Sequence, residues 1–219
     1  GEDNIFPHHE SEIAQSEAAT GKKFVKYWLH PRFLKIEGEK MSKSLKNFFT
    51  LADIEKKGFS PLALRYLFLT AHYRSAFNFT WKSLEAAQNA LGRLSDTVSS
   101  LKDGAGKIDK KYQQKFLAAV NDDLNMPKAV SVVWQSVKDT KLKDPDKKKT
   151  LLDFDRVLGL DLAKIKKTPI PSSVKKLAEK RETLRKQNKW QEADKIRQEI
   201  ERQGFKLEDT KSGPKIKKI

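Results

Sequence analysis

Apolar residues in the middle of the chain recur every three to four positions, and this period constrains the fold more than any other feature. It holds from Trp81 to Val98 over about eighteen residues, a spacing typical of helices that bury one face. The same spacing returns later in the chain at residues 116–124, 129–137 and 151–158. Turn-forming residues lie between, at 103–106 and 143–146. The sequence therefore predicts an antiparallel helical bundle over residues 59–165.

The first fifty-eight residues show a different, mixed pattern. Pro7 and the acidic residues after it predict a helix from His8 to Thr20 that ends at Gly21. Residues 24–29 are rich in strand formers, and residues 33–40 alternate around a turn at Gly38, which predicts a strand and then a hairpin. Residues 1–58 are expected to be the end of an α/β domain.

A proline-containing linker at residues 164–173 precedes a third region, residues 172–219. Two short amphipathic helices are expected there, the second ending at Gly204, followed by a hairpin near the C-terminus. The predicted fold class is mainly α: the C-terminal slice of an α/β domain, an antiparallel helical bundle and a small α+β domain.

Positive charge is concentrated at the C-terminal end of the chain. The whole sequence has a formal net charge of +16, and residues 164–219 contain 18 Lys and Arg against 8 Asp and Glu. A polyanion such as a nucleic acid is the expected partner, and a solubility tail is the alternative.

The composition also narrows the class of protein. The chain contains no cysteine, which excludes disulfides and cysteine metal sites within it and agrees with a cytoplasmic protein. It has no apolar run long enough for a membrane span and no signal peptide at its start. Because it does not begin with Met, residue 1 is expected to be an internal position of a longer protein.

Lys40-Met41-Ser42-Lys43-Ser44 is the motif with the clearest chemistry. Two ammonium groups and two hydroxyls on one loop after a strand can bind a triphosphate and stabilise the charge that develops as pyrophosphate leaves. Taken alone, the five residues fit a solvated loop or a phosphorylation site equally well.

A second motif lies about thirty residues upstream, and the pair resembles class I cysteinyl-tRNA synthetases. In that family a Phe-Pro-His-His-Glu-x-Glu helix, here residues 6–12, precedes the Lys-Met-Ser-Lys-Ser loop. The resemblance extends through Tyr27-Trp28-Leu29-His30, Ala71-His72-Tyr73-Arg74-Ser75 and Gly204–Thr210, so it spans nearly the whole chain in the family's order.

The resemblance implies an ATP site and a zinc site. Lys40 and Lys43 would be catalytic; Met41, Ser42, Ser44 and Asp3 would complete the ATP contacts, with Asp3 near the ribose or merely capping a loop. His8 and Glu12 would bind zinc, since residues four apart share a helix face. They are otherwise ordinary first-turn residues. The family's other two zinc ligands are cysteines upstream of residue 1, and its His-x-Gly-His signature is absent from this chain.

The resemblance also implies that tRNA binds to the two later regions. Residues 59–165 would support the inner corner of the tRNA, with Arg65 capping or pairing within the bundle. Residues 172–219 would bind the anticodon through Trp190, Lys215, Lys217 and Lys218, although the helical register of Trp190 with Ala193 also fits a core anchor.

The expected function is part of a cysteine–tRNA ligase that uses ATP as its magnesium complex. The enzyme is expected to act as a monomer in the cytoplasm, without a membrane. This chain alone is expected to be inactive, because it lacks the phosphate-binding histidines and the zinc cysteines. Two alternatives remain at this point: a stand-alone RNA-binding module, and a related ligase that joins cysteine to an amino sugar.

Overall fold

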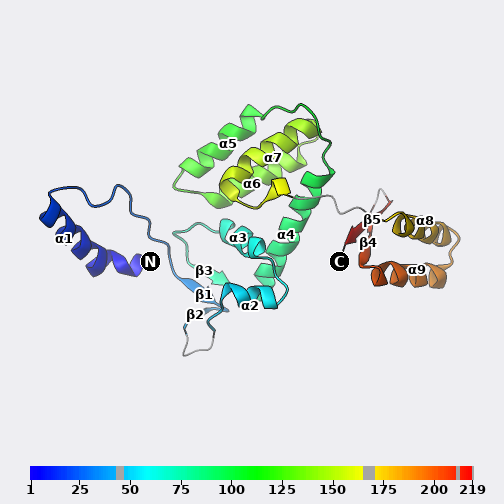
Figure 1. Ribbon diagram of the computed structural model, residues 1–219, viewed down its shortest axis with the longest axis horizontal. Coiled ribbons are helices and arrows are strands. Elements are labelled where there is room, and N and C mark those ends of the chain that lie inside the picture. Colours follow the sequence, from blue (N-terminus) through cyan, green and yellow to red (C-terminus); the bar gives the residue numbers. More distant parts are fainter. Residues whose placement is uncertain (43–46, 165–170, 211–212, 219) are drawn as a thin grey trace. The chain divides into compact units, whose positions relative to one another are not determined.

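The computed structural model describes residues 1–42, 47–164, 171–210 and 213–218 (Figure 1). The chain forms two compact units, residues 1–165 and residues 166–219. Helices dominate both units, so the predicted mainly α fold is confirmed. No helix in the described part of the chain is both long enough and apolar enough to cross a membrane.

A small sheet lies near the start of the first unit. Its strands are β1 (Leu34–Ile36), β2 (Glu39–Lys40) and β3 (Phe77–Phe79), in the order β2-β1-β3. β1 and β2 are the predicted hairpin, and Glu37 and Gly38 turn between them with positive φ angles. β3 was not expected from the sequence; it pairs parallel to β1, with Leu34 opposite Phe77.

The helices of the first unit from residue 51 onward share one hydrophobic core. Ile36 and Ile54 share that core with the later helices, so it runs across the predicted boundary at residues 58–59. Within the bundle, Phe116 and Phe154 stack with ring centroids 4.3 Å apart. The helices are α2 (Leu51–Lys56), α3 (Pro61–Leu69), α4 (Trp81–Ser100), α5 (Lys110–Asn121), α6 (Met126–Lys138) and α7 (Asp144–Leu158), with a final 3-10 turn at Leu162–Lys164.

Local sequence explains where these helices begin and end. The Thr50 and Thr80 hydroxyls each accept a hydrogen bond from the backbone three residues on, at the starts of α2 and α4. Arg65 caps the C-terminal end of α7, because its Nε donates to the Leu158 carbonyl at 2.5 Å. The expected capping role of Arg65 is therefore confirmed.

The N-terminal segment differs from its prediction in two places. The helix begins later than His8: a 3-10 turn (Glu2–Asn4) and a π turn (Ile5–His9) lead into α1 (Glu10–Thr20), which ends at Gly21 as expected. Residues 24–29 form no strand among the described residues, and the chain bends at Phe24 and Lys26. That prediction was wrong, because strand-forming side chains make a strand only where a second strand supplies the hydrogen bonds.

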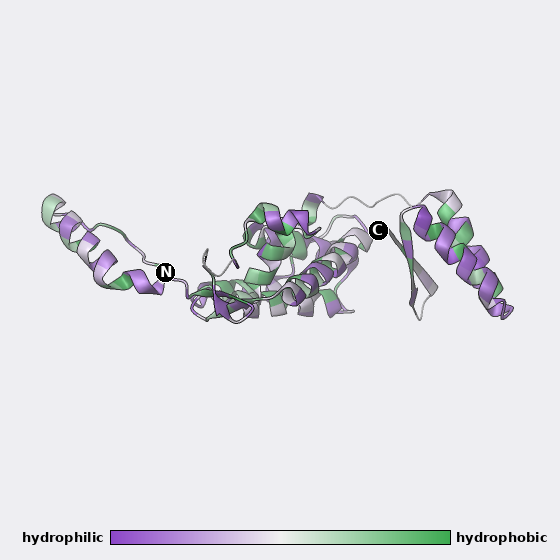
Figure 2. Ribbon diagram, turned by 90° about the horizontal axis from the view of Figure 1, so that it is seen from below, coloured by the Kyte–Doolittle hydropathy of each residue, from purple (hydrophilic) through white to green (hydrophobic). Residues whose placement is uncertain are grey.

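The second unit contains α8 (Ser172–Lys186), α9 (Trp190–Arg202), β4 (Phe205–Thr210) and β5 (Gly213–Lys218). β4 and β5 form the predicted antiparallel hairpin, with Leu207 opposite Ile216. Hydrophilic residues dominate the ribbons of α8 and α9 in Figure 2, with hydrophobic residues interspersed at helical spacing. Hydrophobic residues of α8, α9 and β4 meet in a core of their own: Val174, Ala178, Leu184, Ala193, Ile196, Ile200, Phe205 and Leu207.

Candidate ATP and nucleic-acid binding sites

Lys40 lies at the end of β2 with its side chain exposed, and Asn47 fixes the chain on both sides of the loop that follows. The Asn47 amide donates to the Lys40 carbonyl at 2.9 Å and accepts from the Ser42 backbone N–H at 2.8 Å. Met41 is half-buried and packs against the core. The two ends of the loop are therefore held by one side chain. The predicted Lys43 and Ser44 lie outside the described residues.

The two adjacent histidines of the N-terminal motif have different surroundings. His8 is exposed, as is Glu12. His9 is half-buried: its Nδ1 shares a 2.8 Å hydrogen bond with Nε2 of His30, and its ring stacks on Trp28 at 4.7 Å between centroids. Of the pair, His8 is the more exposed, and its assignment as a zinc ligand stays a prediction.

The described residues contain no group of three or more His, Cys, Asp or Glu that could hold a metal ion. A structural zinc site needs four ligands. His8 and Glu12 can therefore supply half of one, and the fit to zinc within this chain is partial.

A polar pocket of about 240 Å³ opens beside the first residues. One wall is fixed by Arg32, whose Nε donates to both carboxylate oxygens of Glu2 at 3.1 and 3.2 Å. Asp3, the residue predicted near the ribose, is exposed in the adjoining turn. The remaining pocket residues are Ile5, Trp28, His30 and Arg74.

Trp190 lies at the start of α9 and is 54% exposed. The Arg185 guanidinium is 5.8 Å from the centroid of its ring. The first buried residue of α9 is Ala193, one turn later, so Trp190 is not the core anchor that its helical register allowed. An exposed aromatic ring beside a cation is a geometry on which nucleic-acid bases stack.

Arg181 joins α8 to the C-terminal hairpin. Its side chain is 4% exposed, and its two terminal nitrogens donate to Asp209 of β4 at 2.8 and 3.1 Å. Arg185 adds a third bond to Asp209 at 2.6 Å. Arg181 first, and then Arg185, hold the pKa of Asp209 far below its ordinary value. This ion pair fixes β4 against the helix that carries Arg185.

Comparison with known proteins connects the two units to one family. Residues 1–89 match the family model described as the class I (C) tRNA synthetase catalytic domain. Cysteine–tRNA ligase 1 of Burkholderia lata is 42% identical over 219 residues, which cover 99% of this chain and 46% of that protein. The cysteine–tRNA ligases of Chlamydia muridarum and Chlamydia abortus are each 40% identical over the whole chain and over 52% and 50% of their own lengths.

The chain is homologous to cysteine–tRNA ligases. The resemblance noted in the sequence is thus confirmed, and it covers both units, including the region with Trp190 and Asp209. The chain spans about half the length of the curated relatives it matches.

Sequence reasoning missed two residues beside the candidate ATP loop that follows Lys40. Asn47 had no predicted role, and its two hydrogen bonds depend on tertiary contacts with Lys40 and Ser42. Lys35 lies directly opposite Lys40 in the β1–β2 register, and both are exposed. Side chains opposite each other lie on one face of a sheet, so the hairpin pattern around Gly38 could have revealed this pair of cations.

The remaining predicted tRNA-binding residues, Lys215, Lys217 and Lys218, lie on β5, whose backbone pairs with β4. Their side chains are outside what the structure describes.

Proposed function

We propose that this chain forms part of an enzyme that activates cysteine with ATP and transfers it to its tRNA. The observation that carries the proposal is the match along the whole chain to proteins named cysteine–tRNA ligase. A stand-alone RNA-binding module is not favoured, because it would not explain why residues 1–89 match a catalytic-domain model. We further propose a cytoplasmic, monomeric enzyme.

In this proposal Lys40 and Lys43 bind the ATP phosphates, with Met41, Ser42 and Ser44 shaping the loop and Asp3 near the ribose. Lysine charges placed where negative charge develops stabilise the transition state for pyrophosphate release, and removal of one such group costs about a hundred- to a thousandfold in rate. The two hydrogen bonds of the Asn47 side chain, to the backbone of Lys40 and Ser42, support the assignment of this loop to ATP binding, because they hold Asn47 against the start of the loop. Lys35 adds positive charge beside Lys40.

His8 and Glu12 are proposed as two ligands of a zinc ion whose other ligands come from the remainder of the enzyme. Zinc would supply a soft Lewis acid that prefers a thiolate over a hydroxyl. The exposed position of His8, next to the engaged His9, supports the assignment.

The second unit is proposed to bind the anticodon region of the tRNA. The Arg185–Trp190 pair offers a stacking surface for one unpaired base. Lys215, Lys217 and Lys218 would contact phosphates nearby. The bundle, residues 59–165, would support the inner corner of the same tRNA.

A salt titration of the full chain with the tRNA for cysteine and with an anticodon-swapped copy tests this proposal. We expect the logarithm of the binding constant to fall linearly with the logarithm of the salt concentration, because phosphate contacts release counterions. The swapped anticodon should weaken binding by about 1–3 kcal/mol. Equal binding of the two RNAs would contradict anticodon recognition by this chain.

Two sets of variants separate stacking from charge. Trp190→Ala should lose most of the discrimination between the RNAs, whereas Trp190→Phe, which keeps an aromatic face, should retain it. Replacing Lys215, Lys217 and Lys218 with Ala should weaken binding to both RNAs alike and flatten the salt dependence. Loss of discrimination in the lysine variant but not in Trp190→Ala would reverse the two roles.

A further inference from the structure

The turn between α5 and α6 has an unfavourable backbone conformation. Asp123 and Leu124 have φ angles of 50° and 54°, in the left-handed region that favours glycine. A side chain on Cβ makes this region unfavourable, more so for leucine than for aspartate. Conformations of this kind persist only where the surroundings fix them, and they concentrate at sites with a task.

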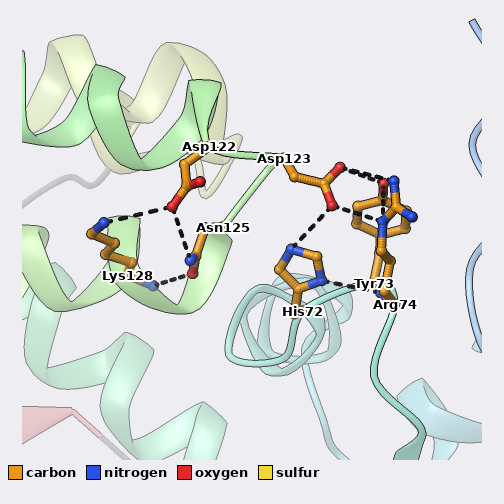
Figure 3. Close-up of polar contacts among 7 residues, drawn as sticks. All are labelled: His72, Tyr73, Arg74, Asp122, Asp123, Asn125 and Lys128. Atoms are coloured by element: carbon orange, nitrogen blue, oxygen red, sulfur yellow. Dashed lines mark hydrogen bonds and ion pairs between the residues drawn. The ribbon is translucent and has the colours of Figure 1, made fainter.

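Three side chains from one distant segment converge on Asp123 (Figure 3). Tyr73 Oη donates to Asp123 Oδ1 at 2.6 Å, Arg74 Nε lies 2.7 Å from Oδ2, and His72 Nε2 lies 3.9 Å from Oδ2. The hydrogen bond from Tyr73, and then that from Arg74, hold the pKa of Asp123 below its ordinary value. The strained turn thus presents one carboxylate to the segment between α3 and β3.

Tyr73 also contacts the strand that leads to the ATP loop. Its carbonyl accepts the Arg32 backbone N–H at 2.9 Å, two residues before β1. β1 pairs with β2, which ends at Lys40. One residue therefore connects the bundle, through its side chain, with the sheet beside the ATP loop, through its backbone.

Apolar packing beneath this connection is incomplete. A cavity of about 450 Å³ lies between the turn and the sheet, lined in part by Leu34, Phe68 and Phe77 on one side and by Leu124 and Met126 on the other. A void forfeits the van der Waals contacts that would otherwise fix the turn. Backbone hydrogen bonds hold the turn internally, such as that from the Asn125 N–H to the Ala119 carbonyl at 3.1 Å, and the polar contacts of Asp123 connect it to the segment that carries Tyr73.

We propose that Tyr73 and Asp123 form a positioning contact through which RNA bound to the helical bundle orders β1, β2 and the start of the ATP loop at Lys40. The RNA-dependent half of this inference rests on the proposed function. The contact itself does not depend on it.

Two residues within the bundle serve as matched controls. Asp122, the neighbour of Asp123, interacts with Lys128 and Asn125 and so stays within its own turn and α6. Tyr112 donates to Asp139 at 2.9 Å, a second tyrosine–aspartate hydrogen bond that lies wholly inside the bundle.

Hydrogen exchange of the full chain without RNA tests the contact. In Tyr73→Phe, the amides of Arg32 and residues 34–40 should exchange about five- to tenfold faster, as expected for one lost hydrogen bond. Tyr112→Phe should leave these amides unchanged. Unchanged exchange in Tyr73→Phe, or equal acceleration in both variants, would overturn the proposal.

Exchange in the presence of the tRNA for cysteine tests the coupling. Wild-type chain should gain protection at residues 34–40, and Tyr73→Phe should lose that gain while binding the tRNA within twofold of wild type. Asp123→Leu should also lose the gain in protection at residues 34–40. Asp123→Asn should keep much of that gain, because asparagine retains an acceptor for Tyr73 and suits a left-handed φ. Asp122→Asn should behave as wild type.

The outcomes distinguish the two proposals. A wild-type chain that does not bind the tRNA contradicts the proposed function, and the RNA-free exchange then still decides whether the contact orders β1. If the wild-type chain binds the tRNA and every variant gains as much protection at residues 34–40 as the wild type does, the coupling alone is contradicted.

Discussion

Residues 1–48 and residues 171–218 differ in how far their described residues bury apolar side chains. In the N-terminal region only Ile36 is buried, while seven large hydrophobic side chains are exposed among the described residues: Ile5, Phe6, Phe24, Tyr27, Leu29, Phe33 and Phe48. Residues 171–218 bury eight hydrophobic side chains in one core, and Trp190 is their one exposed large hydrophobic among the described residues.

This difference separates a region that completes its own core from one that does not. Exposed apolar side chains gathered in one region usually mark an interaction surface. The chain spans about half the length of its relatives, and its N-terminal residues match a catalytic-domain model. Residues 171–218 therefore complete a hydrophobic core of their own, whereas the described residues of the N-terminal region do not.

The largest expected effect comes from truncating a buried residue of the C-terminal unit. Ile200 is fully buried, so Ile200→Ala should cost about 2–5 kcal/mol in the free energy of unfolding of that unit. Phe6 is 77% exposed, so Phe6→Ala should change stability by no more than about 0.5 kcal/mol. Urea unfolding followed by hydrogen exchange measures both, and a Phe6 effect above about 2 kcal/mol would break the comparison.

The ion pair of Arg181 should rank next. Asp209→Ala leaves a buried guanidinium without its main partner and should destabilise the second unit by about 1–3 kcal/mol, the usual contribution of hydrogen bonds to a charged group. The control is Glu201→Ala, which removes the exposed pair with Arg197 at 3.4 Å and should cost about 0.5 kcal/mol or less. Equal losses of stability in Asp209→Ala and Glu201→Ala would mean that the buried ion pair of Arg181 contributes no more than the exposed pair of Arg197.

The same pair predicts how the C-terminal unit responds to acid. The folded pKa of Asp209 lies below its unfolded value, so its contribution to stability is complete above about pH 4 and is lost as the pH falls from there toward the folded pKa. Wild-type stability should therefore decline below pH 4 more steeply than that of Asp209→Asn. Urea unfolding between pH 7 and pH 2 gives the two curves, and parallel curves would exclude this contribution.

The smallest effect tests whether the N-terminal region is ordered locally without a core. Asn47→Ala removes two hydrogen bonds beside the ATP loop and should accelerate exchange of the Ser42 amide by about fivefold, near 1 kcal/mol. Asn78→Ala removes the bond to the Gly38 amide in the neighbouring hairpin turn and should affect Gly38 but not Ser42. Rapid Ser42 exchange in wild type would show that Asn47 does not order the loop.

Local pattern determined much of this protein. The helical period located the bundle and the two C-terminal helices. Apolar residues every three to four positions lie on one face of a helix, and that face packs into the core. Alternation around Gly38 located the β1–β2 hairpin. The motif around Lys40 and the paired histidines predicted the resemblance to cysteine–tRNA ligases, and the matches along the whole chain confirm that resemblance.

Tertiary structure alone decided which distant segments meet. Phe77–Phe79 became a strand because β1 lay beside it, whereas residues 24–29, with better strand formers, found no partner among the described residues. Tyr73 and Asp123, fifty residues apart, meet only because α5 and α6 turn beside the sheet. Trp190 stays exposed because the buried residues of α9 begin one helical turn later, at Ala193. Propensity and period act over a few residues, but these contacts depend on packing between elements, which no local pattern encodes.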